Sequence, residues 1–447
     1  MPEPIISVSG LRGIVGKSLT PDVAMRFVAA FAAGLPEGSI VVSHDGRTTG
    51  PMLANAVRSA LCAVGRHVFD AGIQATPTVG LLVRAEKAVG GVQISASHNP
   101  PEYNGLKLFS AEGRVISAAA GNEVIEHYRH GDAAWATHER VGQIGVIAHP
   151  ALAHLRALAA IVDVKKIQKR AFRVILDSNH GAGGVLGQVM LADFGCKATV
   201  LAEKPTGLFV HPPEPCAENL AGVLSRVVEA GADVGFCQDP DADRLAIIDE
   251  KGRYIGEEYT LALCLDHVLT KLKGTVVTNC STSRICEDIA RKHGSRLVHS
   301  AVGEANVCDL MLAEKAVFGG EGNGGPIDPR VGYVRDSFVG MALVLEGLAT
   351  RGGTLSDWVD SLPKYAIHKS KLALAADRVP ALLDALEKKY TGAKFSRRDG
   401  LRIDWPDDQA WLLVRASNTE PIVRAIAEAP ELAHAQKLCE AVAELAR

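Results

Sequence analysis

The sequence predicts an α/β fold with three related mixed α/β domains in series and a smaller C-terminal α+β domain. The length of 447 residues allows about three domains of ordinary size. Strands and helices alternate in three successive stretches of the chain, whereas the last stretch has a pattern of strands followed by one helix. We place the domains at residues 1–150, 151–253, 254–366 and 367–447.

In the first domain, helix signals alternate with short apolar strands. Thr20 and Pro21 form an N-cap and first-turn signature that opens a helix lasting to about Leu35. Beyond it we predict, in order, the strand 40–42, the helix 51–64, the strand 68–69, the helix 78–89 and the strand 91–94. This alternation predicts a mostly parallel sheet with helices on its faces.

The second and third domains repeat this plan, and the fourth departs from it. In the second we predict strands at 173–176, 198–201 and 233–237, a glycine turn at 180–184, and helices that end at 194 and span 220–230. In the third we predict strands at 275–278, 296–299 and 316–319 and helices at 284–293 and 304–314. In the tail we predict strands at 401–403, 410–414 and 422–427 and a helix at 432–446, after a movable joint near 366–370.

Composition and charge exclude several classes of protein. The 48 Lys and Arg against 51 Asp and Glu give a net charge of −3, and no basic block suggests a nucleic-acid or anionic-membrane partner. No apolar run approaches the ~18 residues that span a bilayer, and the N-terminus lacks the pattern of a secretory signal, so we expect a cytoplasmic protein. Nine scattered cysteines without a CxxC pair predict reduced thiols rather than disulfides or a zinc site.

The first motif with chemical content is Ser95-Ala96-Ser97-His98-Asn99-Pro100-Pro101. It follows a predicted buried strand, and ligands and catalytic groups of α/β sheets gather at the carboxyl ends of strands. A plain polar turn is the alternative, since Ser, Asn and Pro are common turn residues. The segment lacks the G-x-S-x-G pattern of a hydrolase elbow, and the adjacency of Ser97 and His98 does not by itself make a nucleophile and base pair.

The second motif is a run of three aspartates, Asp239, Asp241 and Asp243, between a predicted strand and an apolar run. Three carboxylates at alternate positions converge only if a cation neutralises their repulsion, which predicts a Mg²⁺ site. A solvated acidic turn is one alternative. An EF-hand is another, with Glu250 at position 12, but Arg244 stands where that loop needs glycine and the flanks have strand patterns.

The third motif is the glycine-rich segment 319–325, which follows a predicted strand. Its glycines let the backbone approach a ligand, and Glu321 and Asn323 supply hydrogen-bonding groups suited to hydroxyls. A simple flexible loop is the alternative.

The fourth motif lies between two strands of the tail. Arg415 and Arg424 bracket Ser417, Asn418 and Thr419, and this set of fork donors and hydroxyls suits a phosphate dianion. A surface hairpin loop with incidental arginines is the alternative.

Two further basic residues accompany these motifs. Arg12 stands between glycines near the N-terminus, and Lys107 follows Ser97 by ten residues. Solvated surface charges are the alternative interpretation of both.

Together and in this order, the motifs make the sequence similar to the α-D-phosphohexomutase family, whose members interconvert hexose 1-phosphates and 6-phosphates. The resemblance extends over nearly the whole chain, from Arg12 to Arg424. It implies four domains around a central cleft and a phosphoserine at Ser97. It also implies that Mg²⁺ is bound by the phosphoryl oxygen on Ser97 and by the three aspartates of the second motif, Asp239, Asp241 and Asp243.

The resemblance also assigns expected roles to the other motif residues. Residues expected to bind substrate are Arg244 beside the third aspartate, Glu321 and Asn323 at the sugar hydroxyls, and Arg415, Ser417, Asn418, Thr419 and Arg424 at the distal phosphate. Candidates for proton transfer and charge stabilisation near the serine are Lys107, His98 and Arg12.

The expected reaction passes a phosphoryl group from Ser97 to one end of the sugar. A hexose 1,6-bisphosphate forms and turns around before the serine takes back the other phosphate, so one phosphate clamp serves both orientations and should sit on a mobile domain. The expected partner is a small sugar phosphate, and the expected assembly is a monomer or homodimer. The alternatives are a Mg²⁺-dependent phosphohydrolase, in which water accepts the phosphoryl group, and a non-catalytic sugar-phosphate-binding protein.

Three positions depart from the family pattern. Asn323 stands where many members have serine, and Gly325 where many have histidine. Glu304 stands where some members carry a histidine, and a glutamate can replace that histidine as a hydrogen-bond donor only when its carboxyl group is protonated. The glycine-rich segment 319–325, called the sugar loop below, contains the sequence GEGNGG, which resembles the corresponding loop of archaeal-type phosphoglucosamine mutases and their bacterial relatives. We therefore expect a glucosamine phosphate as substrate, with phosphomannomutase or phosphoglucomutase specificity as the alternative.

Overall fold

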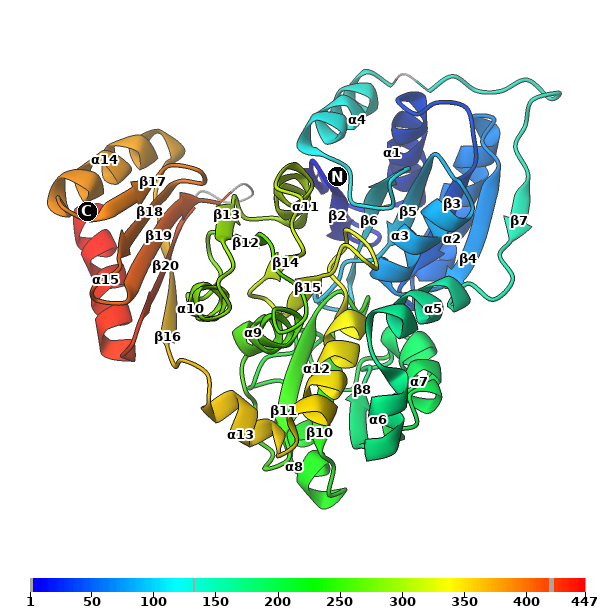
Figure 1. Cartoon of the computed structure of the whole chain (residues 1–447). Helices are drawn as coiled ribbons and strands as arrows, with labels where there is room; N and C mark the ends of the chain where they lie inside the picture. Colours follow the sequence, from blue (N-terminus) through cyan, green and yellow to red (C-terminus); the bar gives the residue numbers. More distant parts are fainter. Residues whose placement is uncertain (1–2, 132, 418–421, 447) are drawn as a thin grey trace.

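The computed structural model describes residues 3–131, 133–417 and 422–446, which form four sheets that follow one another along the chain (Figure 1). Three sheets are flanked by helices in the predicted α/β manner, and the C-terminal one is antiparallel. None of the helices in the described ranges combines the length and the hydropathy needed to cross a bilayer.

Domain I is built on a seven-stranded sheet of order β1-β2-β6-β5-β3-β4-β7. Its strands are β1 Ile5–Ser7, β2 Gly10–Ile14, β3 Ile40–His44, β4 Val68–Ile73, β5 Gly90–Ile94, β6 Tyr103–Ser110 and β7 Ile144–Val146. The helices are α1 Pro21–Ala33, α2 Gly50–Ala63, α3 Thr76–Ala85 and α4 Ala118–His130. Along β3, Ile40 and Val42 share one core with α1 and α2, whereas Val41 packs with α3 on the other face.

The expectation of a mostly parallel sheet in this domain is wrong. Strands β3, β4, β5 and β7 pair in parallel, but β6 runs antiparallel to both β5 and β2, and β2 runs antiparallel to β1. The sequence did not predict the antiparallel half of the sheet, because β2 contains Gly10, Arg12 and Gly13, which are uncommon in strands and weaken its strand pattern. This half brings Arg12 and Lys107 beside the end of β5.

Domains II and III share a large part of their core. Domain II has the sheet β11-β10-β8-β9, with strands β8 Arg173–Asp177, β9 Lys197–Leu201, β10 Val234–Gln238 and β11 Leu245–Asp249 and helices α5 Leu152–Ile161, α6 Val164–Arg170, α7 Gly183–Asp193 and α8 Ala221–Glu229. One cluster of buried side chains joins Phe236 of β10 to Phe338 of domain III. These two domains therefore form one packed body.

Domain III has the sheet β13-β12-β14-β15. Its strands are β12 Val276–Asn279, β13 Leu297–Ser300, β14 Phe318–Glu321 and β15 Gly325–Ile327, and its helices are α9 Glu257–Val268, α10 Ile285–Lys292, α11 Glu304–Ala313, α12 Ser337–Arg351 and α13 Leu355–Asp360. The strands and helices predicted for domains II and III are confirmed to within two residues at nearly every end.

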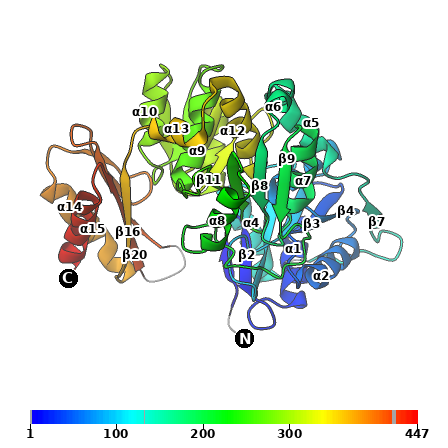
Figure 2. The same ribbon diagram turned by 90° about the horizontal axis from the view of Figure 1, so that it is seen from below.

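Domain IV is an antiparallel sheet of order β16-β20-β19-β18-β17 with its own core, and it lies at one end of the molecule in both ribbon views (Figures 1 and 2). It packs against domain III, where Trp411 and Cys280 share a small buried cluster. Its elements are β16 Ala366–Ala373, β17 Lys394–Ser396, β18 Leu401–Trp405, β19 Ala410–Ala416, β20 Ile422–Ala429, η1 Ala376–Arg378, α14 Val379–Lys389 and α15 Leu432–Ala446. The predicted joint near 366–370 is wrong, since these residues are part of β16 and pair with β20. Polar side chains alternate along this edge strand, which made it resemble a linker.

Candidate active site

Ser97 lies at the first turn after β5, where its backbone is held in an uncommon conformation. Its φ is +49°, in the left-handed region that a residue with a Cβ seldom adopts. The Ser97 backbone N–H donates to Ser95 Oγ at 2.8 Å, and Ser95 Oγ in turn donates to Asp45 Oδ2 at 2.6 Å. Only 3% of Ser97 is exposed. Such a strained backbone at a buried polar turn is typical of functional sites, and this turn is not a plain surface loop.

Arg47 fixes the same loop through hydrogen bonds, and only 1% of this arginine is exposed. Its guanidinium donates to the backbone carbonyls of Ser97 and Asn99, both at 2.6 Å, and to those of Pro100 and Tyr103. Its Nε donates to Asp45 Oδ2 at 3.2 Å. All donors of one buried arginine are thus committed to the shape of the serine loop.

Replacing this arginine, Arg47→Met, is expected to lower the free energy of unfolding by about 3 kcal/mol or more. Burial raises the pKa of Asp45, and without Arg47 this buried carboxyl group would have no cation beside it. Four backbone carbonyls would also lose their hydrogen-bond donor. Urea denaturation followed by circular dichroism measures the loss. Arg26→Met is the matched control, since the exposed Arg26 makes an ion pair with Asp22 and lies over the ring of Tyr128, and its replacement should change stability by less than ~1 kcal/mol. Equal losses in the two variants would contradict this role of Arg47.

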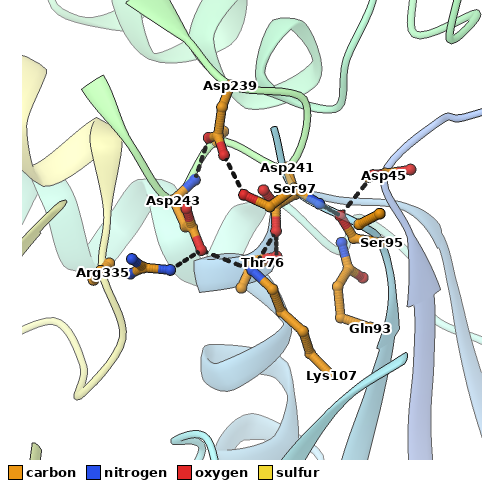
Figure 3. A network of polar contacts seen from close by, with 12 residues as sticks. Asp45, Thr76, Gln93, Ser95, Ser97, Lys107, Asp239, Asp241, Asp243 and Arg335 are labelled. Carbon is orange, nitrogen blue, oxygen red and sulfur yellow. Dashed lines mark hydrogen bonds and ion pairs between the residues drawn. The ribbon is translucent and has the colours of Figure 1, made fainter. Parts of the chain in front are cut away.

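The three aspartates lie in the loop between β10 and β11 and face Ser97 (Figure 3). Each of them is 0% exposed, so the loop is not a solvated acidic turn, and its flanks are antiparallel strands, so it is not an EF-hand. Ser97 Oγ donates to Asp239 Oδ2 at 2.6 Å. Asp239 Oδ1 accepts the backbone N–H groups of Asp243 and Arg244, which fixes the carboxylate at the mouth of the loop.

Two basic side chains offset part of the charge of this triad. Lys107 Nζ donates to Asp241 Oδ2 at 2.6 Å and to Asp243 Oδ2 at 2.7 Å, and Arg335 Nη2 donates to Asp243 Oδ2 at 2.6 Å. Burial alone lowers the pKa of Lys107, but the two aspartates raise it above its ordinary value. The lysine is therefore a fixed cation at neutral pH, which suits it to stabilising negative charge and not to acting as a base.

The carboxylates respond to these neighbours in opposite ways. Burial, with repulsion from Asp241 and Asp243, raises the pKa of Asp239 well above its ordinary value. Burial also opposes ionisation of Asp243, but Arg335 and Lys107 outweigh it and lower the pKa of that carboxyl. The site therefore holds two firmly ionised carboxylates and, beside the serine hydroxyl, one that gains a proton easily.

The donor set of the triad fits a magnesium ion. Among the described residues, Asp241 Oδ1 and Asp243 Oδ1 are buried without a hydrogen-bond partner, which is costly unless a cation lies nearby. One oxygen of each aspartate lies within 4.8 Å of the others, and the described residues contain no second such group. Hard oxygen ligands in this arrangement suit Mg²⁺.

Three more predicted residues, His98, Arg12 and Arg244, lie close enough together for their charges to interact. His98 Nδ1 is 3.3 Å from Ser97 Oγ, and burial, with help from Arg244 and Arg12, lowers the pKa of His98 to about 3. His98 is therefore neutral at neutral pH, and its low pKa makes the imidazole a weak base. The guanidinium of Arg12 makes no hydrogen bond or ion pair to any other described side chain, so its donors are available to an anion.

The sugar loop is the tight turn between β14 and β15. Glu321 lies at the end of β14, and its carboxylate accepts four donors, from Asn279 and Gly303 on Oε1 and from Arg335 and Asn323 on Oε2. Glycine at 322 leaves room for the Glu258 carboxylate, which a Cβ at that position would approach to 2.0 Å. The loop is a rigid platform and not the flexible segment of the alternative interpretation.

The fourth motif, called the phosphate loop below, connects β19 and β20 in domain IV. Arg415 and Arg424 are directly paired across these strands, and Arg415 Nε donates to Asp399 Oδ1 at 3.0 Å. Arg424 Nε is buried and lacks a hydrogen-bond partner within the described ranges. The backbone N–H of Ser417 donates to the carbonyl of Ile422 at 2.9 Å. Asn418 and Thr419 lie outside the described residues.

Several residues of the site were not predicted from the sequence. Arg335, Arg47 and Thr76, whose Oγ1 donates to Asp241 Oδ2 at 2.5 Å, belong to no motif. Asp399, whose Oδ2 accepts the backbone N–H of Val302, joins the phosphate loop to domain III. The segment around Arg47 does follow a predicted strand, and its position at a carboxyl end was the one available signal.

Comparison with known proteins agrees with this fold throughout the chain. The sequence matches the four domain models of the phosphoglucomutase/phosphomannomutase family: alpha/beta/alpha domains I, II and III over residues 5–135, 153–252 and 257–365, and the C-terminal domain over residues 369–445. The fold therefore defines a phosphohexomutase, an isomerase that interconverts the 1-phosphate and the 6-phosphate of a hexose. The chain belongs to the phosphoglucomutase/phosphomannomutase family.

Individual relatives are similar over almost their full length. A phosphoglucomutase/phosphomannomutase of Thermococcus kodakarensis is 37% identical over 443 residues, which cover 96% of each chain. A probable phosphoglucosamine mutase of Pyrococcus horikoshii is 31% identical over 97% of this chain and 94% of the relative. The crystal structure of a phosphoglucomutase/phosphomannomutase family protein from Burkholderia thailandensis has a TM-score of 0.86 and 26% identity, over 99% of this chain and 98% of that one.

Proposed function

We propose that this phosphohexomutase carries the phosphoryl group on Ser97, uses Mg²⁺ held by the aspartate loop, and acts on a hexosamine phosphate. The observation that carries the proposal is the placement of Ser97 Oγ, 2.6 Å from Asp239 Oδ2 in a buried cluster of three carboxylates. A serine hydroxyl in such a cluster lacks the exposure of an ordinary turn residue, and its neighbours suit the anionic chemistry of phosphoryl transfer.

The transfer runs in two balanced halves. In the first, the bond between phosphorus and Ser97 Oγ breaks while a bond forms between phosphorus and a hydroxyl oxygen of the sugar monophosphate, which gives a hexose 1,6-bisphosphate and the free serine. The hydroxyl loses its proton to a base, and the serine oxygen gains one. His98 Nδ1, 3.3 Å from Ser97 Oγ, is placed for such a transfer by its position and not by its basicity. After the bisphosphate turns around, the other phosphoryl group returns to Ser97 by the reverse steps.

The chain's own residues hold the reacting groups for this exchange. Mg²⁺, held by Asp239, Asp241 and Asp243, would supply charge neutralisation at the transferring phosphoryl group. Arg12 and Arg244 have donors free for the same group, since Arg12 makes no hydrogen bond or ion pair and Arg244 Nε no hydrogen bond to a described residue. The hydrogen bond from Ser97 to Asp239 exists only while the serine carries its hydroxyl proton, and it breaks on phosphorylation.

The far end of the substrate would meet domain IV. Arg415 and Arg424 lie side by side at the mouth of the phosphate loop and offer fork donors to a phosphate at either end of the sugar. We assign Ser417, Asn418 and Thr419 to the same clamp. Because domain IV has a separate core, it can move as a unit while the bisphosphate turns around.

The preference for an amino sugar has an electrostatic argument. Glu304 and Glu321 line the sugar side, and Arg335 is the cation that both of them contact. Burial raises the pKa of Glu304, although Arg335 opposes the shift. An ammonium group on the sugar would relieve this excess of carboxylates, which favours glucosamine phosphate over a neutral hexose phosphate.

The thiols support a cytoplasmic setting. All nine cysteines are free, and most are buried, which fits a reducing cytoplasm. We propose a cytoplasmic monomer or homodimer whose partner is the small sugar phosphate.

The activity is tested by ³¹P NMR of the purified protein with Mg²⁺, a trace of the matching hexose 1,6-bisphosphate and, in separate tubes, the 1-phosphates of glucosamine, glucose and mannose. We expect a 6-phosphate in each active tube and the fastest conversion with glucosamine 1-phosphate. Faster conversion of glucose or mannose phosphate would contradict the amino-sugar preference. Accumulation of inorganic phosphate would indicate a phosphohydrolase, and no change in any tube would indicate a binding protein.

A further inference from the structure

One arginine outside every sequence motif lies at the meeting point of three segments. Arg335 is 8% exposed and precedes α12. Its Nη2 donates to Asp243 Oδ2 at 2.6 Å, its Nη1 donates to Glu321 Oε2 at 2.9 Å, and its Nε lies 3.4 Å from Glu304 Oε2. A single guanidinium therefore joins the aspartate loop of domain II, the sugar loop of domain III and the first turn of α11.

The backbone around Arg335 is fixed by further hydrogen bonds. The Arg335 backbone N–H donates to Glu304 Oε1 at 2.8 Å. The next residue, Asp336, caps α12 by accepting the N–H groups of Phe338 and Val339, and its other oxygen lies 2.8 Å from His154 Nε2. The guanidinium is therefore aimed at the carboxylates by a rigid helix start, and it does not reach them from a flexible loop.

The contact with Asp243 has two opposite consequences for a metal ion. Arg335 and Lys107 both donate to Asp243 Oδ2, so the carboxylate is oriented and Oδ1 is left for the metal. A fixed positive charge on the same carboxylate also repels a divalent cation, and in a buried site this repulsion is strong. Without Arg335, Lys107 would still orient Asp243, so the lost repulsion should dominate and the metal should bind more tightly.

The contact with Glu321 has a simpler consequence. Arg335 is the cation that holds Glu321 Oε2, whose other donor, Asn323, is 3.4 Å away. Without the guanidinium, this buried carboxylate loses its charged partner, and the sugar loop loses its side-chain link to Asp243, although the backbone hydrogen bond from Leu245 to Gly324 stays. Substrate binding should then weaken.

We propose that Arg335 is a positioning residue that couples the aspartate loop to the sugar loop. Its positive charge lowers the affinity of the site for Mg²⁺, and its contact with Glu321 holds that carboxylate in place relative to the reacting Ser97. The proposal deepens the proposed function and rests on it. It predicts changes of opposite sign at two ligands, whereas a merely structural arginine would weaken both.

The test compares Arg335→Met with Arg335→Lys and with the control Arg330→Met. Arg330 forms its ion pair with Asp328 and with no residue of the site. Isothermal titration with Mg²⁺ measures metal binding to the unphosphorylated protein, and steady-state kinetics measure KM and kcat for the hexose 1-phosphate. Circular dichroism checks the fold of each variant.

Arg335→Met is expected to lower the Mg²⁺ dissociation constant by about tenfold and to raise KM by ~10- to 100-fold. Arg335→Lys keeps the charge but cannot span three carboxylates, so Mg²⁺ binding should stay near the wild-type value while KM rises as in the methionine variant. Arg330→Met should change neither quantity.

Weaker Mg²⁺ binding in Arg335→Met, or an unchanged KM in Arg335→Lys, would overturn the proposal. If Arg335→Met does not fold, the lysine variant decides alone through the split between unchanged metal binding and raised KM. Failure of the proposed function is distinguishable, because the wild-type protein would then show no mutase turnover while the Mg²⁺ titrations still report the effect of the arginine charge.

Discussion

Replacing Ser97 with alanine is expected to abolish mutase turnover, with a loss of at least about 1000-fold, because the phosphoryl group then has no oxygen on which to rest between the two transfers. The fold should survive, since among the described residues the serine hydroxyl has hydrogen-bond partners only in Asp239 and His98. Conversion of the hexose 1-phosphate by ³¹P NMR measures the loss, and circular dichroism checks the fold.

The control for this experiment is Ser110→Ala. Ser110 lies at the far end of β6, and its hydroxyl is buried without a hydrogen-bond partner in the described parts of the chain, so its removal should leave turnover unchanged. A Ser97→Ala variant that keeps more than about a tenth of the wild-type rate would show that the phosphoryl group is not carried on this residue.

Neutralising one aspartate, Asp241→Asn, is expected to reduce Mg²⁺ affinity by ~10-fold or more and turnover by ~100-fold or more. Asp241 Oδ1 is one of the two free carboxylate oxygens of the site, and its Oδ2 is the partner of Lys107. An amide is a weaker ligand than a carboxylate, and its NH₂ group would face the ammonium of Lys107 if placed there. Isothermal titration with Mg²⁺ and ³¹P NMR measure the two effects.

The matched control, Asp233→Asn, changes an exposed aspartate that accepts the Arg173 backbone N–H and lies away from the cluster. It should bind Mg²⁺ as the wild-type protein does. If Asp241→Asn bound Mg²⁺ with unchanged affinity, the aspartate loop would not be the metal site, whatever its effect on turnover.

The parts of the fold that sequence reasoning predicted are those with short-range signals. Buried strands followed by polar turns placed Ser97 and the aspartate loop at strand ends, and both do lie there. The antiparallel half of domain I and the edge strand β16 were not predicted, because their residues are glycine-rich or polar. These segments become strands by pairing with distant segments of the chain.

The same distinction holds within the site. The motif residues Ser97 and Asp239 were found because several chemically apt residues stand together in sequence. Arg335 and Arg47 were missed because each is one arginine among many, and what distinguishes them is contact with carboxylates or carbonyls some 50 or more positions away. Burial of a charged side chain follows from the packing of whole domains, which no local pattern records.

The most direct test of the central claim follows the phosphoryl group itself. The unphosphorylated protein is mixed with Mg²⁺ and a hexose 1,6-bisphosphate, and intact-protein and tandem mass spectrometry locate any added phosphoryl group, about 80 Da. We expect a single addition, on Ser97, which disappears when excess hexose 1-phosphate is supplied and bisphosphate is regenerated. A phosphoryl group on another residue, or none on a protein that still interconverts the monophosphates, would contradict the account.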